Sequence, residues 1–204
     1  MGRWAGIILS GGLNTRMEGR NKAFLTIDGQ TFLDRIVATL SACCGEMLLV
    51  TREPERYAGH ADRGLRVVTD ILSARSALTG IHAGLVHMQA DYGLCVGCDT
   101  PLIKKGVLRM LMAATDPDTD IVVPASGPYF QPLCAVYAKH CAPVIEAQLR
   151  SGDFKIAHLF ARMRVRKIPY TQFRIVDERL VSFFNVNSED DLRLAQAGDI
   201  PDIT

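Results

Sequence analysis

The segment Ile7-Ile8-Leu9-Ser10-Gly11-Gly12 decides the fold class, because an apolar strand runs directly into a pair of glycines. The chain continues through Arg16 and Arg20 to Lys22, so basic side chains follow the glycines within one loop. Glycine lets backbone N–H groups approach phosphate oxygens closely, and arginine can donate two parallel hydrogen bonds to a phosphate. A loop after a buried strand lies at the carboxyl edge of an open α/β sheet, where such sheets bind ligands. The segment therefore predicts a phosphate-binding loop on an α/β fold.

The spacing of this loop differs from the two common glycine-rich motifs. A P-loop has lysine directly after its last glycine and then Ser or Thr, whereas Gly19 is followed by Arg20 and Asn21. The dinucleotide fingerprint requires three glycines at fixed offsets, which Gly11, Gly12 and Gly19 do not match. A surface turn with solvated basic side chains is the alternative. The basic residues directly after an apolar strand favour phosphate binding over that turn.

Strand-like and helix-like segments alternate along the chain, which is the pattern of a mostly parallel sheet with crossover helices. We expect strands at residues 4–9, 46–51, 65–69, 94–97, 120–123, 133–137, 165–168 and 183–186. We expect helices at residues 31–40, 81–88, 104–113, 143–150 and 156–163, and a last helix from residue 188. The prediction is an α/β three-layer sandwich, Rossmann-like in layout, with one domain over residues 1–204. Its nucleotide-binding half would cover about residues 1–110 and its acceptor-binding half about residues 111–198.

Composition narrows the classes of protein that fit. The chain has 204 residues, is 48% hydrophobic and carries a formal net charge of +1, so its overall field argues against a nucleic-acid partner. No apolar run reaches the ~18 residues of a membrane span. The apolar stretch near the N-terminus is too short for a signal peptide and leads into the glycine loop. We therefore expect a cytoplasmic protein without a membrane partner.

The pair Cys95 and Cys98 has the spacing of a redox or zinc motif. A zinc site would need a second such pair or two nearby histidines, and the sequence offers neither. The stretch around Cys95 reads as a buried strand, in which cysteine acts as a small apolar residue. We therefore interpret both cysteines as parts of the core.

The loop also resembles a known signature. Leu-Ser-Gly-Gly, then Arg-Met, Gly and Lys, is similar to the signature of the MobA-type molybdenum cofactor guanylyltransferases, a family of nucleotidyltransferases. The usual form there is LAGG, RMGG and DK, so Ser10 replaces alanine, Glu18 replaces glycine and Asn21 replaces aspartate. We expect the Glu18 side chain to point away from the phosphates. The resemblance extends from Leu9 to about Leu192 and implies a nucleotidyltransferase fold.

Asp99 follows the strand at residues 94–97, in the segment Gly97-Cys98-Asp99-Thr100-Pro101-Leu102. A carboxylate at a strand end, beside a phosphate loop, can hold Mg²⁺ against the phosphates. A turn or helix-capping aspartate is the alternative. The resemblance implies that Asp99 is the metal ligand, because the family has an acidic residue with proline at the same place.

Further nucleotide contacts are implied by the resemblance. The family has an aspartate at the position of Asp70, then a Gly-Pro-Leu-Ala-Gly-like segment that Leu78 and Gly80 match, although Ser76 and Ala77 depart from it. Thr51 stands where the family often has a nucleotide-binding asparagine. The expected nucleotide-binding residues are Leu9, Ser10, Gly11, Gly12, Arg16, Lys22, Thr51, Asp70, Leu78 and Gly80.

A pair of segments in the second half resembles the family's acceptor region. Gln131 lies in a Gln-Pro-Leu segment, and Asn185 and Asn187 lie in Phe-Asn-Val-Asn. Residues that are two apart on an extended segment face the same side, so we expect both amides to line an acceptor pocket with Gln131. Turn asparagines are the alternative. Ser188 with Asp191 matches a helix capping box.

The resemblance implies transfer of GMP from GTP to molybdopterin, with Mg²⁺, giving the guanine dinucleotide form of the cofactor and pyrophosphate. Arg16, Lys22 and Asp99 would be its catalytic residues. It also implies contact with the molybdoenzymes that receive the product. Gly11, at the third position of Leu-Ser-Gly-Gly, favours guanine over cytosine, because a methyl group there could crowd a purine. The alternatives are a cytidylyltransferase for molybdopterin, another small-phosphate nucleotidyltransferase, and a nucleotide-binding regulator without turnover.

Overall fold

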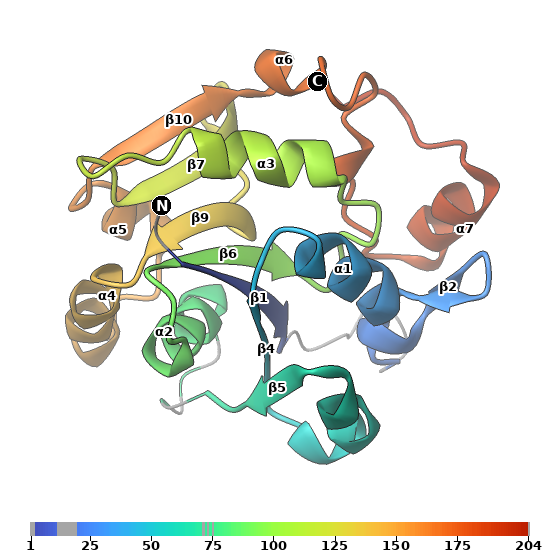
Figure 1. Cartoon of the computed structure of the whole chain (residues 1–204). Coiled ribbons are helices and arrows are strands. Elements are labelled where there is room, and N and C mark those ends of the chain that lie inside the picture. Colours follow the sequence, from blue (N-terminus) through green and yellow to red (C-terminus); the bar gives the residue numbers. More distant parts are fainter. Residues whose placement is uncertain (1–2, 12–19, 71, 73, 75, 204) are drawn as a thin grey trace.

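The computed structural model describes residues 3–11, 20–70, 72, 74 and 76–203, and Figure 1 shows the arrangement of its elements. A central sheet runs through the chain with the strand order β10-β7-β9-β6-β1-β4-β5, and β8 pairs with β7. Its strands are β1 (Trp4–Ser10), β4 (Glu46–Thr51), β5 (Leu65–Val68), β6 (Tyr92–Gly97), β7 (Ile121–Ser126), β8 (Tyr129–Phe130), β9 (Cys134–Ala138) and β10 (Val165–Pro169). A small antiparallel pair, β2 (Thr26–Ile27) and β3 (Gln30–Thr31), lies outside this sheet.

The sheet is parallel on the side that carries the glycine loop. Strand β1 pairs in parallel with β4 and β6, and β4 pairs in parallel with β5. Strand β9 is antiparallel to both β6 and β7, whereas β10 is parallel to β7. The carboxyl ends of β1, β4, β5 and β6 therefore meet at one edge, as the sequence predicts for a ligand site.

Helices cover both faces of the sheet and complete three layers (Figure 1). The α-helices are α1 (Phe32–Ser41), α2 (Ala77–His87), α3 (Lys105–Ala113), α4 (Cys141–Arg150), α5 (Ile156–Phe160), α6 (Tyr170–Phe173) and α7 (Glu189–Ala197). Short 3₁₀ helices are η2 (Lys22–Phe24), η3 (Pro54–Arg63) and η4 (Val181–Phe183). In the described part of the chain, no helix combines the length and apolar character that a membrane crossing requires.

Successive side chains of β1 point to opposite faces of the sheet, and they therefore pack in two separate hydrophobic cores. Ile8 packs with residues of α1 and α3, whereas Ile7 packs with residues of α2 and α4, and both side chains are fully buried. A strand that is buried on both faces reads as a continuous apolar run, as this one does. Helix α2 lies so close to β1 that a Cβ atom on Gly84 would come within 2.5 Å of Ile7. The prediction of a mostly parallel three-layer sandwich is confirmed.

Residues 183–186 do not form the expected strand. The 3₁₀ helix η4 covers Val181–Phe183, directly after Leu180, which has a positive φ of 55°, and residues 184–187 have no regular secondary structure. Phe183 stacks on Tyr170 and packs edge-on against Phe173, so an aromatic cluster holds the turn. Val186 then donates its backbone N–H to the Asp99 carbonyl oxygen at 2.8 Å. Tertiary packing therefore overrides the extended preference of this apolar segment.

Several boundaries also differ from the sequence-based expectation. Helix α2 begins at Ala77, earlier than residue 81, because the Ser76 hydroxyl accepts the Thr79 N–H and caps the helix. Helix α5 ends at Phe160, before residue 163. The 3₁₀ helix η3 was not expected from the sequence. The capping box of Ser188 and Asp191 at the start of α7 is confirmed.

Candidate active site

Lys22, Asp99 and Asn187 meet at the carboxyl edge of the sheet, although they come from three distant parts of the chain. The Lys22 ammonium donates a hydrogen bond to Asn187 Oδ1 at 2.7 Å and lies 3.9 Å from Asp99 Oδ2. Lys22 is the first residue of η2, Asp99 follows β6, and Asn187 precedes α7. The fold thus gathers a cation, a carboxylate and an amide at one place.

The end of strand β6 fixes Asp99. The Thr100 backbone N–H and hydroxyl both donate to the Gly97 carbonyl oxygen, which closes a tight turn around Asp99. Gly97 lacks a side chain, and a Cβ atom there would lie 2.5 Å from Asp99 Oδ1. The carboxylate therefore folds back over a gap that only glycine leaves open. Burial raises the pKa of Asp99, and the nearby Lys22 charge opposes this rise.

Leu9 and Gly80, both expected at the nucleotide site, are in contact. A Cβ atom on Gly80 would lie 3.3 Å from Leu9 Cδ2, so the first turn of α2 approaches the end of β1 closely. Leu78 is buried in the same apolar cluster. Ser10 is the last residue of β1, and Gly11 follows it. Gly12, Arg16 and Glu18 lie outside the described residues.

Asp70 pairs with Arg52, which was not among the residues expected at the site. Arg52 Nε donates to Asp70 Oδ2 at 2.7 Å, and Arg52 also donates to the carbonyl oxygens of Leu72 and Ala74. Burial raises the pKa of Asp70, although the Arg52 charge opposes it. Arg52 thus ties the end of β4 to the segment before α2. Arg52 directly follows the buried strand β4, and this position was the sequence signal that could have identified it.

Thr51 is buried at the end of β4, with 1% of its surface exposed. Its hydroxyl accepts the backbone N–H of Glu53 at 3.2 Å. This contact stabilises the turn into η3, so the hydroxyl has a local role at the end of the strand.

Gln131 and Asn187, two of the expected acceptor residues, have different hydrogen-bond partners. Gln131 Nε2 donates to the Phe183 carbonyl oxygen at 3.4 Å, so Gln131 lies beside the turn that leads to Asn185. Asn187 instead contacts Lys22. Helix η4 ends at Phe183, before both asparagines, and residues 184–187 have no regular secondary structure. The shared acceptor-facing side of Asn185 and Asn187 stays a prediction. The structure groups Asn187 with Lys22 and Asp99.

A family model for the MobA-like NTP transferase domain matches residues 6–167, and this match spans most of the described site. The chain belongs to the MobA-like NTP transferase family. It is 38% identical over 192 residues to a molybdenum cofactor guanylyltransferase of Desulfosudis oleivorans, with 94% of each chain covered. It is 29% identical to a molybdenum cofactor guanylyltransferase of Aliivibrio fischeri, with 91% of this chain and 92% of that one covered.

Two solved structures share this fold. Molybdopterin-guanine dinucleotide biosynthesis protein A from Archaeoglobus fulgidus superposes with a TM-score of 0.81 at 26% identity, covering 96% of this chain and 98% of that one. A nucleotidyl transferase from Methanothermobacter superposes with a TM-score of 0.73 at 19% identity, covering 96% of this chain and 97% of that one. The second likeness shows the fold alone.

A metal in this family member would depend on few protein ligands. Among the described residues, no group of three or more His, Cys, Asp or Glu side chains could hold a metal ion. Asp99 offers one desolvated carboxylate, and Mg²⁺ commonly binds through one or two carboxylates, waters and substrate phosphates. Asp99, in the gap above Gly97, therefore fits a Mg²⁺ ion that arrives with a nucleotide.

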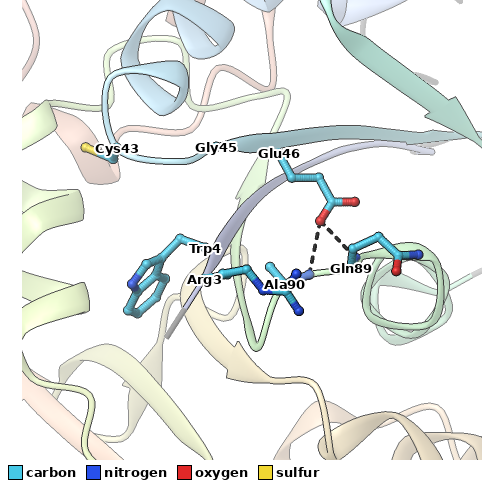
Figure 2. Close-up of a pocket in the computed structure, with 7 residues that line it drawn as sticks. All are labelled: Arg3, Trp4, Cys43, Gly45, Glu46, Gln89 and Ala90. Carbon is cyan, nitrogen blue, oxygen red and sulfur yellow. Dashed lines mark hydrogen bonds between the residues drawn. The ribbon is translucent and has the colours of Figure 1, made fainter. Parts of the chain in front are cut away.

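A cavity of about 580 Å³ lies elsewhere, at the amino edge of the parallel strands (Figure 2). Arg3, Trp4, Cys43, Gly45, Glu46, Gln89 and Ala90 line it. Glu46 Oε2 accepts the backbone N–H groups of Gln89 and Ala90, at 2.8 and 3.1 Å. Its lining includes neither Lys22, Asp99 nor Asn187, so this cavity and the gathered polar groups belong to opposite edges of the sheet.

The cysteines of the Cys95–Cys98 pair lie in different layers of this family member. Cys95 packs in the cluster with α2 and α4, whereas Cys98 packs in the cluster with α1 and α3. Both carry free thiols, and burial raises the pKa of Cys98 to about 12. Their burial confirms the interpretation of both residues as parts of the core.

Proposed function

We propose that this chain transfers GMP from GTP to the phosphate of molybdopterin and releases pyrophosphate. The names of its relatives support the substrates. The observation that carries the proposal is the meeting of Lys22, Asp99 and Asn187 at the carboxyl edge of β6. A desolvated carboxylate beside an ammonium group offers both the metal ligand and the positive charge that a triphosphate needs.

In the proposed reaction, an oxygen of the acceptor phosphate forms a bond to the α-phosphorus of GTP. The bond from the α-phosphorus to the bridging oxygen breaks in line, and pyrophosphate leaves with the electron pair. A phosphate monoester is already largely anionic near neutral pH, because its second pKa is about 6, so no general base is required. The work of the protein is positioning and charge stabilisation.

The chain's own groups divide this work. Lys22, together with Arg16, stabilises negative charge on the α-phosphate and on the departing pyrophosphate. Asp99 would hold Mg²⁺, which supplies Lewis-acid stabilisation of the phosphates when it is bound. Asn187 holds the Lys22 ammonium in place through its Oδ1 atom.

The nucleotide and the acceptor would bind to different parts of the chain. The segments at the ends of β1, β4 and β5 and the first turn of α2 would contact the nucleotide through Leu9, Ser10, Gly11, Thr51, Asp70, Leu78 and Gly80. Gly12 belongs to the same expected set. The acceptor would lie towards Gln131 and Asn185, beside η4, in the half of the chain after residue 110. A cytoplasmic location and delivery of the product to molybdoenzymes belong to this proposal.

Two measurements test the proposed function. A ligand that binds the native state raises the apparent melting temperature, so GTP with Mg²⁺ should raise it more than ATP, CTP or UTP do. Addition of molybdopterin to the GTP complex should then release pyrophosphate. A larger shift with CTP would indicate a cytidylyltransferase, and a shift without pyrophosphate release would indicate a regulator. No shift with any nucleotide would refute the proposal.

A further inference from the structure

The Tyr57 hydroxyl joins the two residues that bracket the glycine-rich segment in the sequence. Its oxygen lies 2.7 Å from Ser10 Oγ, at the end of β1, and 2.8 Å from Asn21 Nδ2, directly before η2. Tyr57 itself belongs to η3 and is fully buried, while Ser10 and Asn21 are 8% and 7% exposed. One buried hydroxyl thus connects three elements that surround the site.

The donors and acceptors of this group can be assigned from its geometry. Asn21 Oδ1 accepts the Ala23 backbone N–H at 3.0 Å, so the amide must turn its Nδ2 towards Tyr57. The Tyr57 oxygen therefore accepts from Asn21, and its own proton can be donated to Ser10 Oγ.

Asn21 is the link between Tyr57 and Lys22. Helix η2 has three residues, of which Lys22 is the first, and Asn21 is its cap. The Lys22 backbone therefore follows Asn21, and its ammonium reaches Asn187 and Asp99 from there. We propose that Tyr57 is a positioning residue whose hydroxyl holds Asn21 against the end of β1 and thereby sets Lys22 beside Asp99. The consequence for turnover rests on the proposed function, whereas the consequence for Lys22 does not.

A purely structural role for Tyr57 is the competing explanation, because its ring stacks on Phe24 with centroids 5.1 Å apart. Tyr57→Phe keeps this ring and removes only the hydroxyl. Tyr137→Phe is the matched control: Tyr137 is also fully buried, and its hydroxyl donates to the Pro132 carbonyl oxygen at 2.9 Å. Both variants lose one buried hydroxyl, and only one of them loses the contact with Asn21.

Acylation of lysine amines, mapped by mass spectrometry, measures the position of Lys22 without any substrate. The Lys22 side chain is 12% exposed, so its amine should react slowly compared with the exposed Lys105 amine. We expect Tyr57→Phe to raise the relative reactivity of Lys22 several-fold and Tyr137→Phe to leave it unchanged. Equal reactivity of Lys22 in wild type and Tyr57→Phe would overturn the proposal.

Steady-state kinetics, measured at temperatures at which all variants are folded, provide the second readout. Tyr57→Phe should lower kcat/KM for the nucleotide by about tenfold, the scale of a displaced charged contact, whereas Tyr137→Phe should change it less than twofold. A wild-type protein that binds no nucleotide would refute the proposed function, and the lysine reactivities would still decide the role of Tyr57. Normal kcat/KM in Tyr57→Phe would refute the positioning role alone.

The direction of the hydrogen bonds is tested by a double-variant cycle. Ser10→Ala leaves the Tyr57 proton without an acceptor, which should lower Tm by about 2–6 °C. Asn21→Asp provides a carboxylate that can accept from Tyr57 and from the Ala23 N–H together. We therefore expect Ser10→Ala with Asn21→Asp to regain most of the lost Tm and the slow Lys22 reactivity. Additive losses in the double variant would overturn the assigned bonding.

Discussion

The two edges of the parallel sheet use their charged groups in opposite ways. At the amino edge, Glu46 Oε2 accepts two backbone N–H groups (Figure 2). Glu46 Oε1 accepts from Arg66, so both carboxylate oxygens are engaged. At the carboxyl edge, Asp99 lies 3.9 Å from the Lys22 ammonium, beyond hydrogen-bond distance, and burial raises its pKa. The amino edge has the 580 Å³ cavity, and the carboxyl edge has the meeting of Lys22, Asp99 and Asn187.

This difference indicates that, among the described residues, a desolvated charge pair marks the candidate site better than cavity volume does. A carboxylate with complete hydrogen bonds gains little from a ligand, because binding would have to replace bonds that already exist. A desolvated carboxylate is strongly stabilised when a metal cation arrives, and the neighbouring ammonium group is stabilised when a phosphate arrives. Matched substitutions at the two edges can therefore test this contrast. The largest effect on nucleotidyl transfer is expected at Asp99.

Asp99→Asn and Glu46→Gln make the same chemical change at the two edges. Asp99→Asn should reduce transfer by ~10²-fold or more, as expected when a preorganised electrostatic group is lost. Glu46→Gln should leave transfer unchanged and cost about 1 kcal/mol of unfolding free energy through weakened hydrogen bonds. Pyrophosphate release and urea unfolding measure the two effects. Near-normal activity in Asp99→Asn would make Asp99 a turn residue and remove the contrast.

Lys22→Ala and Arg20→Ala compare two neighbouring basic residues. Lys22 contacts Asn187 within the site, whereas Arg20 is about half exposed and pairs with Glu189 at the start of α7. An exposed ion pair contributes about 0–1 kcal/mol, so Arg20→Ala should change turnover less than twofold. Lys22→Ala should lower it by about 10- to 100-fold through the loss of phosphate stabilisation. Equal losses in steady-state kinetics would indicate a diffuse basic surface.

Gly97→Ala tests whether the gap at the carboxyl edge matters. The new Cβ atom would lie 2.5 Å from Asp99 Oδ1 and 3.5 Å from Leu133 Cβ, so the carboxylate is the group that must move. We expect a loss of several-fold in kcat, with the Mg²⁺ requirement shifted to higher concentrations and a cooperative unfolding transition retained. Gly45→Ala, whose Cβ atom would meet open space at the amino edge, is the control. An unchanged Mg²⁺ requirement in Gly97→Ala would contradict the role of the gap.

The sequence predicted the layers of this fold because its strands are apolar runs separated by clear helix signals. It also predicted the place of Asp99, since a polar residue directly after a buried strand must lie at the carboxyl edge. The contact between Asn187 and Lys22 could not be predicted, because 165 residues separate them and the turn at η4 depends on packing around Phe183. Tyr57 was missed because its hydroxyl partners, Ser10 and Asn21, lie 47 and 36 residues away in the sequence, so no local pattern connects them.

The smallest expected effect is on the fluorescence of Trp4, which reports on the amino edge alone. Trp4 is the only tryptophan of the chain, lines the cavity at the amino edge, and stacks on Tyr92 with ring centroids 5.1 Å apart. GTP with Mg²⁺ binds at the carboxyl edge in our proposal, at the far ends of β1 and β6, so it should raise the melting temperature and leave Trp4 fluorescence unchanged. Free N-acetyltryptophanamide, titrated with the same nucleotide, corrects for absorption of the light. Quenching of Trp4 that saturates together with the thermal shift would mean that the nucleotide also binds in, or is coupled to, the cavity. The contrast between the edges would then fail.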